Sequence, residues 1–184
     1  QTQQGKAIEI GRLQRFAVDS LFASNVPQLF ARAASTGKRI AVVGAGPAGL
    51  ACAHGLARQG HGVVIHEAKP RAGGLNEYGL ATYKTTDDFA QKEIAWLLSI
   101  GGIRIEHGYQ FNAAALKALQ ASFDAVFIGI GLGMVAALNL PGEDLAGVRN
   151  AIDFIAELRQ SDPAKVPMGR RVVVIGGGMT AVDA

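Results

Sequence analysis

The sequence contains a single cysteine, Cys52, among its 184 residues. One cysteine cannot form a disulfide within the chain, and it cannot supply the thiolates of an iron–sulfur cluster or a Cys-rich zinc site. A redox-active Cys-x-x-Cys pair is excluded for the same reason. We interpret Cys52 as a packing residue. The four histidines show no metal-ligand spacing, so the sequence predicts no metal site and a fold held together by packing.

The sequence also lacks a long uninterrupted apolar segment and a dense basic segment. Its longest apolar run, residues 125–138, has 14 residues, three of them glycine, whereas a membrane-spanning helix needs about 20. The formal net charge is only +3, and the excess lies in residues 1–38, which hold five basic and two acidic residues. No basic run is interleaved with aromatic residues, as nucleic-acid binding would favour. These absences, and that of a signal peptide, predict a cytoplasmic protein that binds neither membranes nor nucleic acid.

Glycine, by contrast, is abundant: the chain has 24, close to twice the average share of about 7%. Between the glycine clusters, apolar runs typical of strands alternate with helical patterns. The predicted strands are 39–43, 62–66, 103–106, 124–129 and 171–175. The predicted helices are 10–34 with an interruption at Pro27, 47–58, a segment from a Thr86 cap to Gly101, 113–121, and a segment from an Asn150 cap to Gln160. This alternation predicts an α/β fold, a Rossmann-like parallel sheet with flanking helices, in which the continuous apolar strand 124–129 is covered on both faces.

The residues Gly44-Ala45-Gly46-Pro47-Ala48-Gly49 form a G-x-G-x-x-G motif between the first predicted strand and the helix that follows it. In that position the first glycine permits a tight turn, the second lets the backbone approach a pyrophosphate, and the third lets the helix pack closely on the sheet. The N-terminus of the helix then presents free N–H groups to the phosphates. The motif therefore predicts a dinucleotide site at this turn.

Glu67, at the end of the second predicted strand, lies 23 residues after Gly44, near the offset of about 20 expected for a carboxylate that binds the adenosine ribose. A carboxylate favours ribose hydroxyls and repels a 2′-phosphate, so this turn is predicted to bind FAD or NAD rather than NADP. Gly73 and Gly74 follow as a second place where the backbone can approach a ligand, which favours FAD. The alternative interpretation is a structural turn followed by a surface glutamate.

A second strand–glycine–helix junction, Gly176-Gly177-Gly178-Met179-Thr180-Ala181, begins 132 residues after the first. Alanine is allowed at its third position. Two dinucleotide signatures in one chain predict a flavin held by the first turn and a nicotinamide cofactor delivered by the second. The alternative is a glycine-rich turn that closes the sheet.

Three stretches carry a family resemblance: residues 10–16, residues 40–79, and residues 140–155 together with the Gly176 turn and Asp183. They resemble the glutamate synthase small-subunit (beta-subunit) family, which is shared with the electron-input part of dihydropyrimidine dehydrogenase. The resemblance implies that NAD(P)H reduces FAD and that electrons leave through 4Fe-4S clusters to a larger partner subunit or domain. It also implies that a cysteine-rich iron–sulfur domain precedes these residues and is missing here.

The resemblance also implies a role for individual residues. The residues that would line the FAD pyrophosphate are Gly44, Ala45, Gly46, Pro47 and Ala48, and Glu67 would hold the ribose. Gly74 and Leu75 would approach the flavin side, and Gly131 would lie near the cofactor at the end of its strand. The residues that would begin the NAD(P)H site are Gly176, Gly178, Met179 and Thr180. One departure follows Gly79, where Ala81-Thr82-Tyr83-Lys84 replaces a Pro- and Arg-containing stretch; this favours the pyrimidine-reducing branch.

The chain begins at Gln1 rather than at a methionine and ends at Ala184 inside a predicted helix, so we expect a fragment of a longer protein. Three parts are predicted within it. Residues 1–38 would be a helical linker after the iron–sulfur domain, residues 39–160 an incomplete FAD-binding Rossmann domain, and residues 161–184 a linker and the start of an NAD(P)H-binding domain.

We therefore predict an FAD-dependent NAD(P)H oxidoreductase, of which these residues alone are inactive. No catalytic residue is predicted, because hydride transfer is the cofactor's chemistry; Tyr83 and Lys84 either approach the flavin or lie in a solvated loop. Two alternatives stay open: a non-catalytic structural or docking fragment, and a single-cofactor dehydrogenase that binds NAD at the first turn. The substitution Glu67→Arg is expected to remove FAD and leave the fold intact.

Overall fold

The computed structural model describes residues 7–24, 27–132 and 135–184, and the chain divides into two compact units, residues 1–31 and 32–184. The first unit contains one helix, α1 (Ile10–Ala23), among its described residues. The predicted continuation at 29–33 is wrong, because those residues are not helical and five residues are too few to form a helix without tertiary support. Residues 25 and 26 of that prediction lie outside the described residues. The division into the three predicted parts stays a prediction.

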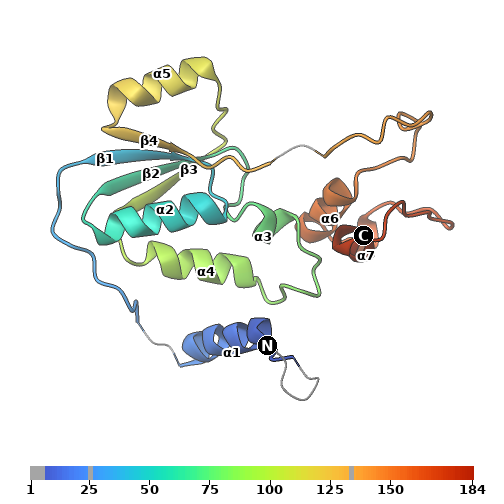
Figure 1. Ribbon diagram of the computed structural model, residues 1–184, viewed down its shortest axis with the longest axis horizontal. Coiled ribbons are helices and arrows are strands. Elements are labelled where there is room, and N and C mark those ends of the chain that lie inside the picture. The colour runs from blue at the N-terminus through green and yellow to red at the C-terminus, as the bar shows by residue number, and fades with distance from the viewer. Residues whose placement is uncertain (1–6, 25–26, 133–134) are drawn as a thin grey trace. The chain divides into compact units, whose positions relative to one another are not determined.

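The second unit is built on a parallel sheet of four strands (Figure 1). The strands are β1 (Arg39–Val43), β2 (Gly62–Glu67), β3 (Ile103–His107) and β4 (Ala125–Ile128), in the order β3-β2-β1-β4. Val43, the last residue of β1, pairs with His66 on one side and with Ile128 on the other. The carboxyl ends of the three strands therefore lie together at one edge. The predicted Rossmann-like sheet is confirmed, with strand ends within two residues of those expected.

The predicted fifth strand, 171–175, is wrong. These residues have no regular secondary structure, and Val173 is 86% exposed. Their β-branched side chains favour a strand, but a strand forms only where a neighbour accepts its backbone hydrogen bonds. Within the part of the chain that the structure describes, no strand pairs with them.

Helices follow the strands, and three of them cover the faces of the sheet: α2 (Pro47–Arg58) and α4 (Phe89–Leu98) lie on one face and α5 (Ala113–Ser122) on the other. The other helices described in the second unit are α3 (Leu75–Tyr78), α6 (Ala151–Gln160), the 3₁₀ helix η1 (Pro163–Lys165) and α7 (Met179–Asp183). Helix α4 begins later than predicted. Asp87 and Asp88 adopt positive φ values of 60° and 55°, so Asp88 rather than Thr86 is the N-cap. None of the helices in the described ranges has the length and apolar character that crossing a membrane requires.

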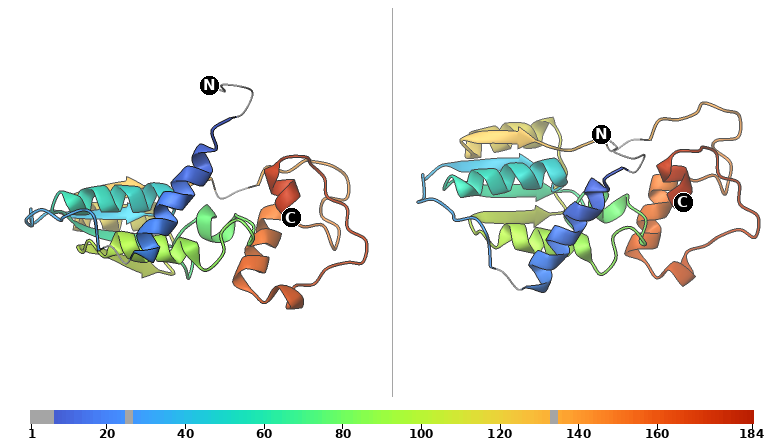
Figure 2. Two further views of the ribbon diagram at one scale, coloured as in Figure 1. Left: turned by 90° about the horizontal axis from the view of Figure 1, so that it is seen from below. Right: turned by 60° about the horizontal axis from the view of Figure 1, so that its bottom comes forward.

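Two layers of side chains form the core. Val42 and Ile65 pack with residues of α2 and α4 on one face of the sheet, and Ala41 and Val43 pack with Leu119 of α5 on the other. Figures 1 and 2 show the helices on the two faces of the sheet. Alternate residues of β1 thus face opposite layers, as the pleat of a strand requires. Strand β4 was predicted to be covered on both faces, and this prediction is wrong. It lies at one edge of the sheet, and three of its four residues are exposed.

Candidate functional site

The first glycine turn lies at the carboxyl edge of the sheet, between β1 and α2. The chain crosses from β1 to β2 on one side and reaches β4 on the other, so the strand order reverses at β1. In open α/β sheets, ligands bind beside the carboxyl ends of the strands at such a reversal. The predicted dinucleotide motif therefore occupies the position in this fold where a cofactor is expected.

Two glycines of the turn are needed because the backbone packs too closely there for a side chain. Gly44 has a φ of 98°, and a Cβ atom there would lie 2.5 Å from the carbonyl oxygen of Gly129, just after β4. A Cβ atom on Gly49 would lie 1.9 Å from the carbonyl oxygen of Gly44, so α2 sits directly against the turn. The Gly44 N–H donates to the carbonyl of His66 at 2.8 Å. These contacts fix the N-terminus of α2 at the edge of the sheet.

Gly46 faces a second glycine segment rather than a side chain. The nearest atom to a Cβ placed on Gly46 is the Cα of Gly74, at 3.8 Å, and the Gly73 N–H donates to the carbonyl of Ala45 at 2.8 Å. Gly74 itself has a φ of 54°. Pro47 and Ala48, in the first turn of α2, are exposed. Two backbones thus approach each other without side chains beside the N–H groups of a helix N-terminus, and this cradle fits the pyrophosphate of a dinucleotide.

Glu67 is brought to the same place from the end of β2. Its side chain is buried, the residue being 8% exposed. One carboxylate oxygen accepts the Ala45 N–H at 2.7 Å, and the other accepts the Lys69 N–H at 2.8 Å. Each oxygen keeps a further lone pair that a ribose hydroxyl can use. The arrangement changes our expectation for Glu67→Arg: because the carboxylate supports two backbone N–H groups, an arginine there would disturb the turn as well as the ligand.

The structure thus brings together Gly44 to Ala48, Glu67 and Gly74. Leu75 begins α3 immediately after Gly74 and is exposed. Gly131 lies two residues beyond Gly129, has a φ of 68° and is exposed. The positions of Leu75 and Gly131 at the carboxyl edge agree with their predicted side of the site, but their roles stay predictions.

The second glycine turn is only partly formed. Gly176 has a φ of 135°, Gly178 is the N-cap of α7, and Met179 and Thr180 begin that helix. The strand predicted before the turn is not formed, as described above. Gly178, Met179 and Thr180 are exposed, so the turn is accessible. The assignment of a nicotinamide cofactor to these residues stays a prediction.

Asp183, the last residue of α7, is bound by the loop that was predicted to approach the flavin or the solvent. The Tyr83 hydroxyl donates to its Oδ1 and the Lys84 ammonium to its Oδ2, each at 2.7 Å. The sequence offered no signal for this contact, since 99 residues separate Lys84 from Asp183.

The three groups shift one another's pKa values. The hydrogen bond from Lys84 lowers the pKa of Asp183, while the bond to Asp183 raises the pKa of both Lys84 and Tyr83. The contribution of Asp183 to stability is present above its ordinary pKa and is lost as the pH falls through the lowered value. The contributions of Lys84 and Tyr83 are present below their ordinary pKa values and are lost as the pH rises through the raised ones. The contact is therefore most stable at intermediate pH.

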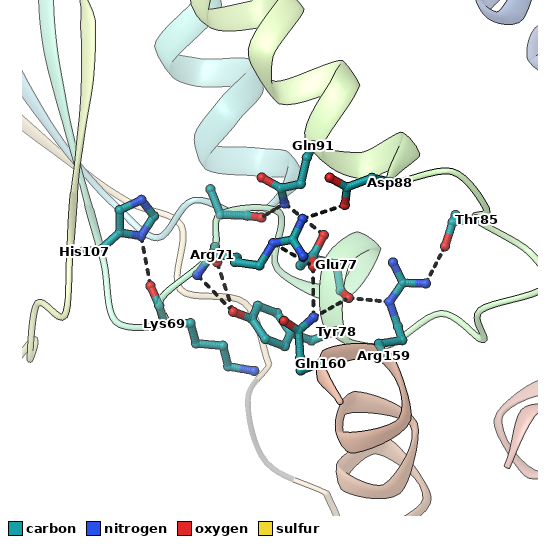
Figure 3. Close-up of polar contacts among 11 residues, drawn as sticks. Lys69, Arg71, Glu77, Tyr78, Thr85, Asp88, Gln91, His107, Arg159 and Gln160 are labelled. Atoms are coloured by element: carbon teal, nitrogen blue, oxygen red, sulfur yellow. Dashed lines mark hydrogen bonds and ion pairs between the residues drawn. The ribbon is translucent and has the colours of Figure 1, made fainter. Parts of the chain in front are cut away.

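A buried polar network, centred on Glu77 of α3, joins the loop after β2 to α4 and α6 (Figure 3). Glu77 is 2% exposed, and its carboxylate accepts from Gln91 at 2.8 Å and from Gln160 at 2.9 Å, with Arg71 at 3.2 Å. Arg159 donates to the backbone carbonyls of Glu77 and Leu80 and to the Thr85 hydroxyl. The network fixes α6 to the segment that follows the Gly74 cradle.

Replacing Glu77 with alanine is expected to destabilise the fold by about 2 kcal/mol, because the partly buried hydrogen bonds from Gln91 and Gln160 are lost and Arg71 loses a counter-charge. The measurement is chemical unfolding of the full-length protein. Glu9→Ala, which removes an exposed ion pair with Arg12, serves as the control and should change stability by less than about 1 kcal/mol. Equal effects of the two substitutions would contradict the central place given to Glu77.

The chain matches the pyridine nucleotide-disulphide oxidoreductase family over residues 38–184, and it belongs to that family. With Cys52 as its single cysteine, these residues contain no pair that could form the disulphide of the family's name. Membership rests on the match over residues 38–184 and not on a cysteine pair.

Two curated relatives show which members of the family this chain resembles. The chain is 34% identical to the glutamate synthase [NADPH] small chain of Halomonas elongata, over 96% of this chain and 39% of that protein. It is 31% identical to the NAD-dependent dihydropyrimidine dehydrogenase subunit PreT of Salmonella typhimurium, over 97% and 42%. The predicted family resemblance is confirmed on both branches. The chain spans 28% to 39% of the length of the first curated relatives it matches.

Among solved structures, the chain resembles Mycobacterium tuberculosis FprA in complex with NADPH. The TM-score is 0.56 and the identity 25%, covering 65% of this chain and 28% of FprA. The likeness agrees with the fold built up above, a parallel sheet that carries a dinucleotide turn at its carboxyl edge.

Proposed function

We propose that this chain is the flavin-binding part of an NAD(P)H-dependent electron-transfer oxidoreductase, with FAD at the first glycine turn. The observation that carries the proposal is the cradle itself: Gly46 faces Gly74 backbone to backbone, and the Glu67 carboxylate lies against Ala45. A pyrophosphate needs bare backbone beside a helix N-terminus, and an adenosine ribose needs an acceptor for its hydroxyls. All of these are supplied within one edge of the sheet.

In this proposal each residue of the cradle has a binding task. The backbone of Gly44 to Ala48 surrounds the pyrophosphate, and Glu67 accepts hydrogen bonds from the ribose hydroxyls. Gly74 and Leu75 lie on the flavin side, and Gly131 approaches the cofactor from the end of β4. Bound FAD would supply the redox chemistry, accepting a hydride from NAD(P)H. The chain's own residues bind, orient and shield the cofactor.

The nicotinamide cofactor is assigned to the second turn, at Gly176, Gly178, Met179 and Thr180. The negative charge of Glu67 supports this division, because it disfavours the 2′-phosphate of NADPH at the first turn. The names of two relatives support a nicotinamide cofactor, since one is named for NADPH and another for NAD. Only the start of the second site lies in these residues, so we propose that they do not catalyse turnover alone.

We further propose that the electrons leave through iron–sulfur clusters to a larger partner subunit or domain. The names of the relatives support a partner, because one is a small chain and the other a subunit. The clusters would be bound outside these residues, because Cys52 alone cannot ligate one. The division into a linker (1–38), an FAD-binding domain (39–160) and the start of a nicotinamide domain (161–184) belongs to this proposal.

The test is the identity of the nucleotide that the full-length protein retains. We expect FAD to be released on denaturation, identified by chromatography, and the flavin absorbance near 450 nm to bleach when NADH or NADPH is added without oxygen (about one FAD per chain, one site being proposed). Retention of NAD in place of FAD would favour a single-cofactor dehydrogenase. A protein that keeps no nucleotide, even after incubation with FAD, would favour a structural or docking role.

A further inference from the structure

The segment from Gly79 to Thr85 lies between the two glycine turns. On one side it follows α3, which begins at the Gly74 cradle. On the other side it binds two separate helices: Leu80 and Thr85 accept from Arg159 of α6, and Tyr83 and Lys84 donate to Asp183 of α7. One short segment therefore touches the elements before and after the exposed residues 161–178.

The contact at Asp183 is well suited to fix an orientation. Its side chain is 5% exposed, and each carboxylate oxygen receives its own donor, one from Tyr83 and one from Lys84. Two donors on two oxygens restrain both the position and the rotation of the carboxylate. Asp183 lies five residues after Gly178, the N-cap of α7, so fixing its carboxylate also restrains the direction of the glycine turn.

This contact differs from the exposed ion pairs of the chain. Lys165 and Asp162, for example, lie 3.7 Å apart with side chains 82% and 53% exposed, and such pairs contribute little. Among the described residues, 171–175 form no strand, so no sheet pairing holds the second turn there. Among the described residues, the attachments of α7 that we identify are its packing against α6 and the contact with Tyr83 and Lys84.

We infer that Tyr83, Lys84 and Asp183 form a latch that holds the second glycine turn in a set position relative to the first, so that they are positioning residues for hydride transfer. The consequence for hydride transfer rests on the proposed function. The latch itself does not depend on the proposed function, because it concerns only how residues 176–183 are held. Neither Tyr83 nor Lys84 is assigned a catalytic role.

Hydrogen exchange of the full-length protein, as purified, tests the latch directly. The amides of Ala181 and Val182 donate to the carbonyl of Gly178, and the amide of Ala184 donates to that of Thr180, so their exchange reports the opening of α7. We expect Lys84→Met and Asp183→Asn each to speed exchange at these amides about tenfold, since each removes a charge-assisted hydrogen bond. The double variant should be no faster than either single one, and Lys84→Arg should restore most of the protection. Lys165→Met, in an exposed pair, is the matched control.

The FAD content of every variant is measured in parallel and is expected to equal that of the wild type, because the latch lies outside the Gly44–Gly49 turn. With FAD retained, the rate constant for flavin reduction at saturating NAD(P)H should fall about tenfold in Lys84→Met, as misplacement of a reactant costs rate rather than binding. Unchanged exchange in Lys84→Met and Tyr83→Phe, or equal acceleration in Lys165→Met, would overturn the latch. Absence of FAD from the wild type would defeat the proposed function, while the exchange data would still decide the latch.

Discussion

Replacing Gly46 with alanine is expected to leave the protein folded and to abolish its retention of FAD. Gly46 has φ −77° and ψ −178°, an extended conformation that alanine adopts without strain. The added Cβ would lie 3.8 Å from the Cα of Gly74, which is ordinary contact. The same methyl group, however, would occupy the place where a pyrophosphate approaches the backbone. A loss of at least 100-fold in affinity, about 2.7 kcal/mol, would empty the site during purification.

The matched control is Gly55→Ala, at a glycine inside α2. A Cβ atom at Gly55 meets nothing within 4 Å, so the substitution should preserve FAD and stabilise the helix by about 0.5–1 kcal/mol. The FAD released per chain is measured for both variants, with circular dichroism to confirm their folding. If Gly46→Ala keeps its flavin at the level of Gly55→Ala, the pyrophosphate does not lie at this turn.

The sheet was predictable because its signals are local. Residues 40–43 and 63–65 are short apolar runs, the first followed by a glycine and the second preceded by one, and such runs suit strands buried on both faces. Val172–Ile175 carries the same signal but forms no strand. The difference is the presence of a neighbour: β1 lies between β2 and β4, whereas residues 171–175 lie beside no strand in the described part of the chain. An apolar pattern shows that a segment can form a strand, but the strand forms only where a neighbouring strand pairs with it.

The candidate site likewise contains some residues that could be predicted from the sequence and others that could not. The glycine turn and Glu67 could be predicted, because the fold fixes the number of residues between the first turn and the end of the second strand. The Glu77 network could not, since Gln91 and Gln160 lie 14 and 83 residues from Glu77. A buried carboxylate has no sequence signature that separates it from an exposed one, and its partners come together only after the sheet has brought α3, α4 and α6 into contact.

Gly49→Ala is expected to damage the fold itself, in contrast to Gly46→Ala. Its Cβ would lie 1.9 Å from the carbonyl oxygen of Gly44 and 3.2 Å from a methyl carbon of Val42. The first of these is a backbone atom that cannot rotate away. Gly44 cannot shift easily either, because it already has a positive φ and its backbone packs against that of Gly129. Helix α2 would have to move off the sheet, opening the core where Val42 and Leu50 pack.

We therefore expect Gly49→Ala to cost about 3 kcal/mol or more, at the upper end of overpacking effects, and to lower the unfolding midpoint of this part of the protein by roughly 6–12 °C, as for a domain of 150–250 residues. Thermal and urea unfolding of the full-length protein provide the measurement, with FAD added in excess in one series. Because the damage is in the packing of α2 on the turn, added FAD should not restore the wild-type midpoint. A Gly49→Ala variant as stable as Gly55→Ala would show that α2 does not rest on the Gly44 carbonyl, and the cradle described here would then lose its support.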